Sequence, residues 1–76
     1  MEFLFTVNLS VHEKDMVYEV YFDHEKYIFL PEKNDLHLEP FFFKREHDEW
    51  HDQDIISPQL KKQALNALDN YLLAQH

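Results

Sequence analysis

The pattern best suited to chemistry is a pair of histidines four positions apart, His47 and His51. On a helix, positions i and i+4 share one face with Cβ atoms roughly 6 Å apart, a spacing that lets two imidazoles chelate zinc. No third ligand follows at a recognisable spacing, and residues 44–54 show no helical period. In an extended chain the two histidines would lie about 13 Å apart and could not share an ion. We therefore interpret residues 44–54 as an acidic loop, with a metal site at His47 and His51 as the alternative.

Covalent catalysis has few candidate nucleophiles in this chain. Cysteine is absent, and the aliphatic hydroxyls belong to Thr6, Ser10 and Ser57. Ser10 shares a strand face with His12, but nothing beside them marks an oxyanion hole. With fifteen acidic residues some carboxylates will be close by chance, whereas glycosidase chemistry also needs a cleft between them. We expect no catalytic residues, no cofactor and no enzymatic activity.

Composition excludes several further classes of site and partner. The chain has no glycine, which Walker loops and dinucleotide fingerprints require, and no cysteine for disulfides or thiolate metal sites. Fifteen acidic against seven basic residues leave a formal charge of −8, which disfavours nucleic acid and membrane surfaces. The start of the chain lacks the basic residues of a signal peptide, and no apolar run approaches about 18 residues. We expect a cytoplasmic protein without nucleic-acid or membrane partners.

Alternation of apolar and polar residues predicts an antiparallel sheet. The clearest period of two covers residues 2–12, with Phe3 and Phe5 on one side and Leu4 on the other. The further predicted strands are 16–23, 26–30 and 36 to 43 or 44. Short polar connections favour a meander of hairpins. Pro40 cannot donate a ladder hydrogen bond, so the last strand should sit at an edge or carry a bulge there.

A helix is predicted to begin after Ser57, a good N-cap, with Pro58 at the first helical position. The expected fold is α+β: a four-stranded antiparallel meander sheet with one C-terminal helix packed on one face, forming a single domain over residues 1–76. The predicted core contains Phe3, Phe5, Val7, Leu9, Val20, Phe22, Leu38, Leu65, Leu68 and Leu72.

The sheet face away from the helix carries surplus apolar residues. In plain alternation this open face receives Tyr21, together with Phe41 and Phe43 if Pro40 causes no bulge. With Trp50 these rings are the predicted partner-binding residues of a small protein-interaction module, which either forms a homodimer or binds another protein. The opposing interpretation is that a bulge at Pro40, or residues 44–54 folding over the sheet, buries the rings inside the monomer.

Overall fold

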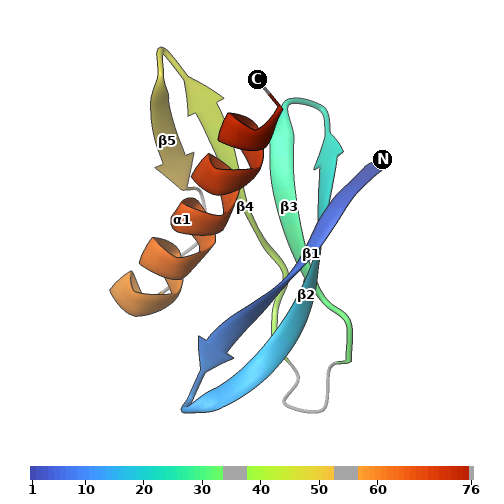
Figure 1. Ribbon diagram of the computed structural model, residues 1–76, viewed down its shortest axis with the longest axis vertical. Coiled ribbons are helices and arrows are strands. Elements are labelled where there is room, and N and C mark those ends of the chain that lie inside the picture. Colours follow the sequence, from blue (N-terminus) through green and yellow to red (C-terminus); the bar gives the residue numbers. More distant parts are fainter. Residues whose placement is uncertain (34–37, 53–56, 76) are drawn as a thin grey trace.

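The computed structural model describes residues 1–33, 38–52 and 57–75, which form five strands followed by one helix (Figure 1). The strands pair antiparallel in the order β1-β2-β3-β4-β5, which confirms the predicted α+β fold of a meander sheet with a C-terminal helix. The elements are β1 (Glu2–Val11), β2 (Lys14–Asp23), β3 (Lys26–Pro31), β4 (Phe41–Glu46), β5 (Glu49–Asp52) and α1 (Pro58–Ala74).

Two-residue turns join three of the four neighbouring strand pairs. Each turn is a histidine followed by an acidic residue, and all six residues have positive φ angles. The turns are His12-Glu13, His24-Glu25 and His47-Asp48. Two consecutive residues with positive φ are characteristic of type I′ hairpin turns. Because a two-residue turn leaves no slack, it determines which residues face each other across the pair.

The fifth strand corrects the prediction of a loop over residues 44–54, where the structure describes strands and a turn as far as Asp52. β4 continues to Glu46, and β5 returns beside it with Trp50 opposite Arg45. The low apolar content of this segment hid the hairpin. One signal identifies it: the His-acid pair at 47–48 repeats the pairs found at the other two tight turns.

The start of β4 resolves the expectation for Pro40. β4 lies between β3 and β5, so it is not an edge strand, and it begins at Phe41 directly after the proline. A proline inside this strand would remove a ladder hydrogen bond. Residues 36 and 37 of the predicted strand lie outside the described residues, and Leu38 to Pro40 are not part of a strand.

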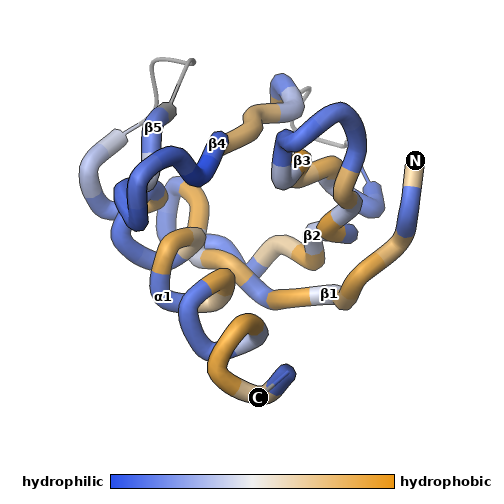
Figure 2. Tube along the Cα trace, turned by 90° about the horizontal axis from the view of Figure 1, so that it is seen from above, coloured by the Kyte–Doolittle hydropathy of each residue, from blue (hydrophilic) through white to orange (hydrophobic). Residues whose placement is uncertain are grey.

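The sheet curls strongly, and α1 lies across its open side between β1 and β5 (Figure 2). Curvature explains how one helix covers five strands, because the strands themselves surround much of the core. Rings and aliphatic side chains from the sheet meet Ala64 and Leu68 of the helix there. The buried core is Leu9, Val11, Tyr18, Val20, Phe29, Phe41, Phe43, Ala64 and Leu68.

The predicted helix start is confirmed. The Ser57 hydroxyl accepts a hydrogen bond from the Leu60 amide at 3.2 Å. Pro58 occupies the first turn, where a backbone N–H would have no partner within the helix, so its missing N–H costs no hydrogen bond. No helix in the described part of the chain has the length and apolar character needed to span a membrane.

A side chain of α1 takes the place of a neighbouring strand at the edge of β1. The Ser10 amide donates to Gln63 Oε1 at 2.8 Å, and Gln63 Nε2 donates to the Ser10 carbonyl at 3.1 Å. A primary amide thus satisfies both backbone groups of one edge residue, as a paired strand would. Edge strands with open backbone groups invite pairing with other chains, so this contact also protects β1.

Replacing Gln63 should therefore expose the end of this edge. We expect Gln63→Ala to lower the free energy of unfolding by about 1–2 kcal/mol, since two hydrogen bonds are lost. Amide hydrogen exchange followed by NMR should show faster exchange at Ser10. Gln59→Ala is the matched control, because only the backbone carbonyl of Gln59 contacts Gln63. Unchanged protection of Ser10 in Gln63→Ala would contradict the assignment.

Candidate functional site

The turn at residues 24–25 decides which residues of β2 and β3 face the helix. It places Val20 opposite Phe29. The next pair along the strands, Tyr21 and Ile28, points to the other face of the sheet. Val20 and Phe29 are fully buried, so their set forms the inner face of the sheet, toward α1. Tyr21 and Ile28 therefore lie on the outer face, where the sequence analysis expects Tyr21.

Four apolar side chains form a row across the outer face, one from each of the first four strands. In the strand register Phe3 faces Tyr21, Tyr21 faces Ile28, and Ile28 faces Phe42. We call Phe3, Tyr21, Ile28 and Phe42 the outer row. Phe3 is 51% exposed, and the other three are half-buried. The row thus places four apolar side chains side by side on the face that α1 does not cover.

A β-bulge brings Phe3 to the outer face and corrects its predicted place in the core. The register shifts between Phe3 and Phe5, which leaves Leu4 as an extra residue. Beyond the bulge Phe5 stacks on Tyr71 of α1 at 4.8 Å, and Leu4 packs against the core. Phe3 instead meets Tyr21 edge to face, with ring centroids 5.5 Å apart.

Polar neighbours hold the rings of the outer row in place. The Tyr21 hydroxyl donates to Glu19 Oε2 at 3.2 Å. Desolvation of the ring, followed by the charge and hydrogen bond of Glu19, raises the Tyr21 pKa above its usual value, so the hydroxyl remains a neutral donor. The Lys26 ammonium lies 4.5 Å from the centre of the Phe42 ring, a cation–π contact.

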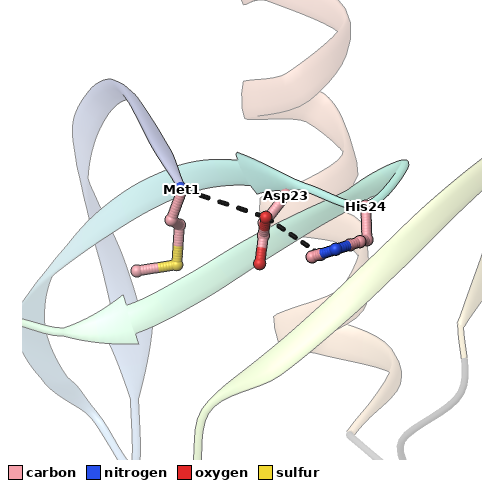
Figure 3. A network of polar contacts seen from close by, with 3 residues as sticks. All are labelled: Met1, Asp23 and His24. Carbon is pink, nitrogen blue, oxygen red and sulfur yellow. Dashed lines mark ion pairs between the residues drawn. The ribbon is translucent and has the colours of Figure 1, made fainter.

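Charged residues flank the outer row toward the end that carries the His24 turn. Across the strands Asp23 faces Lys26, and Lys26 faces Lys44. One carboxylate oxygen of Asp23 lies 3.0 Å from His24 Nδ1 and 3.9 Å from the Met1 ammonium (Figure 3). Exposed pairs of this kind contribute little to stability. Their arrangement matters more, because acidic groups lie on β2 and basic groups on β3 and β4.

Phe41 and Phe43 lie in the core, so their predicted place on the open face is wrong. Phe41 is 3% exposed and Phe43 is fully buried. The physical reason is the register of the β3–β4 pair, in which Phe41 lies opposite Phe29. The Phe41 and Phe43 rings therefore both pack against Phe29 on the inner side of the sheet. The central ring of the Phe triplet, Phe42, takes the outer position instead.

Trp50 lies on the inner side, where it ties β5 to the helix. Its indole N–H donates to Asp69 Oδ1 at 3.0 Å, and the Arg45 guanidinium lies 4.8 Å from the ring centre. Arg45 also pairs with Asp69 at 3.8 Å, and the Trp50 ring meets Tyr27 edge to face at 5.4 Å. These contacts direct Trp50 away from the outer row.

The two histidines of the alternative metal site lie in a hairpin rather than on one face of a helix. His47 is the first residue of the β4/β5 turn, with φ 51°, and His51 belongs to β5. His51 Nε2 lies 4.0 Å from Glu49 Oε2. Within residues 1–33, 38–52 and 57–75, no three His, Asp or Glu side chains gather in a way that could hold a metal ion.

Two members of the outer row were missed by reasoning from the sequence. Phe3 was assigned to the core because nothing in the alternation of residues 2–12 reveals a bulge. Plain alternation placed Phe41 and Phe43 on the open face and so turned Phe42 to the inner side, because the long connection between β3 and β4 gives no local signal for the register of β4. For Ile28 the available signal is the two-residue turn at 24–25, which sets this residue opposite Tyr21.

The sequence matches no protein-family model, and no curated protein or solved structure matches this chain.

Proposed function

We propose that this protein is a non-catalytic interaction module that works through protein contacts, and that a second copy of the chain is the partner its outer face fits best. The observation that carries the proposal is the outer row, which aligns Phe3, Tyr21, Ile28 and Phe42 across four strands. Aromatic side chains dominate the energetics of protein interfaces, and three of these four are aromatic. Sheets that pack face to face bury such rows between them.

The charges beside the outer row support a two-fold arrangement. An axis along β3 would lay β2 of one copy over β4 of the other. Asp23 would then face Lys44 of the second copy, and Tyr21 would meet Phe42. Each such contact occurs twice, because a two-fold interface uses the same patch on both copies.

Two electrostatic terms oppose this association. Each copy carries a formal charge of −8, and the two Lys26 ammonium groups would approach each other near the axis. Salt screens both terms and also the two Asp23–Lys44 pairs, but exposed pairs contribute little, and the burial of rings depends little on ionic strength. Association should therefore be stronger at physiological ionic strength than at low salt.

Sedimentation velocity over a micromolar to submillimolar concentration series tests the proposal. We expect the wild-type protein to associate and Phe42→Ser to weaken dimerisation by about tenfold or more, since truncating a central interface ring costs about 2 kcal/mol. Phe3→Ser should weaken it less, because Phe3 lies at the end of the row.

The matched control is Leu73→Ser on α1, an apolar residue that is 72% exposed and lies away from the sheet face. It should leave the dimer intact. A wild-type protein that stays monomeric at every concentration and ionic strength would rule out the homodimer. Equal weakening by Phe42→Ser and Leu73→Ser would rule out the outer row as the contact surface.

A further inference from the structure

A cavity of about 690 Å³ opens between the first turns of α1, the end of β1 and residues 38–41, remote from the outer row. Its volume falls in the range of small-molecule sites, about 300–1,000 Å³. The apolar part of its lining includes Phe41 and Leu60, and its polar part includes Glu13 and Glu39. Its rim also includes Ser10, Ser57 and Gln63, whose hydrogen bonds are described above.

The Tyr18 hydroxyl reaches this cavity from the core. The residue is 1% exposed, yet it lines the cavity. Among the described residues its hydroxyl has no hydrogen-bond partner, and no side-chain nitrogen or oxygen there is both sealed from solvent and unpaired. The hydroxyl oxygen is therefore accessible to solvent, and this cavity is an open space that Tyr18 lines. Burial raises the Tyr18 pKa above its usual value, so the group stays neutral and keeps its lone pairs.

Acidic groups around this hydroxyl favour a cation. The rings of Tyr18 and Phe41 are buried behind the cavity wall, so the polar groups that a ligand can reach are the Tyr18 hydroxyl and the neighbouring carboxylates. Glu13 and Glu39 add two carboxylates. Within the described lining no Lys or Arg is present, and the basic side chain there is His12.

We infer that this cavity binds a primary amine carried on an apolar body. The apolar body packs against Pro40 and Leu60, and the ammonium lies between the Tyr18 hydroxyl and the Glu13 and Glu39 carboxylates. One ammonium N–H donates to the Tyr18 hydroxyl oxygen. The inference is independent of the proposed dimer, since the two surfaces share no residue.

NMR titration of the ¹⁵N-labelled protein with three matched probes tests the site. 2-Phenylethylammonium has the charge and the apolar body, 2-phenylethanol has the body alone, and phenylacetate reverses the charge. We expect shift changes confined to cavity residues for the ammonium, weaker binding of the alcohol, and no binding of phenylacetate. Tyr18→Phe should weaken the ammonium about threefold to tenfold and the alcohol less, because a hydrogen bond from a neutral donor contributes less than one from a charged donor.

Charge controls separate a site from general attraction to an acidic protein. The double variant Glu13→Gln with Glu39→Gln should weaken the ammonium about fivefold. Glu46→Gln with Glu49→Gln removes the same charge at the far end of β4 and should have no effect. Equal weakening by both pairs, binding of phenylacetate, or the absence of ammonium binding up to millimolar concentration would overturn the inference.

Discussion

Phe43→Ala should destabilise this protein more than any other ring substitution on β4. Phe43 is fully buried and packs against Phe29, Phe41 and Trp50. Truncating a buried phenylalanine costs about 3–5 kcal/mol through lost burial and the cavity it leaves. A domain of this size has about 4–11 kcal/mol of stability to lose. Urea denaturation followed by far-UV circular dichroism should show a large fall in the midpoint, or a chain that is already unfolded.

Phe42→Ala is the matched control, since it removes the same side chain one residue away. Phe42 is half-exposed on the outer face, so we expect a loss below about 1.5 kcal/mol. The pair of variants reports the register of β4 directly. A larger loss from Phe42→Ala than from Phe43→Ala would place β4 one residue out of register, with Phe41 and Phe43 on the outer face.

Glycine at the second position of the three tight turns should stabilise the protein substantially. Glu13, Glu25 and Asp48 have φ angles of 64°, 66° and 63°, and the chain has no glycine. Non-glycine residues pay about 1 kcal/mol or more for a left-handed conformation. The triple variant Glu13→Gly, Glu25→Gly, Asp48→Gly should therefore gain about 2–3 kcal/mol. Thermal unfolding should show Tm rising by about 10 °C or more.

Removing three acidic groups also reduces the formal charge of −8, which could stabilise the protein by itself. The control triple Glu13→Gln, Glu25→Gln, Asp48→Asn removes the same charges and keeps the side chains. We expect it to gain much less than the glycine triple. If both triples raise Tm equally, repulsion between charges is the source of the gain and the turn backbones are not strained.

Local pattern was sufficient to predict the α+β class, the first three strands and the start of the helix. Apolar and polar residues alternate in β1 and β2 because each strand buries one of its two faces, so this signal can be read from each strand alone. The cap at Ser57 and the proline after it act within a single turn of helix. The β4/β5 hairpin was missed because its few apolar residues produce no period, although its His-acid turn repeats the other two.

Long-range packing decided what the pattern left open. Because a two-residue turn joins β2 and β3, the residues of β2 that face inward determine which residues of β3 face inward. β3 and β4 are separated by nine residues, 32–40, and a connection of this length does not determine the register of β4. The inward orientation of Phe41 and Phe43 follows from their pairing with Phe29 and Tyr27, respectively, in a core closed by α1.

Short connections and side-chain alternation are properties of neighbours along the chain, and so the residue order by itself determined the β1/β2 and β2/β3 hairpins and the helix. Which phenylalanine of the triplet faces solvent depends on how far the sheet curls and where the helix closes it. Those features arise from contacts between residues far apart in sequence, and only the tertiary structure decided them.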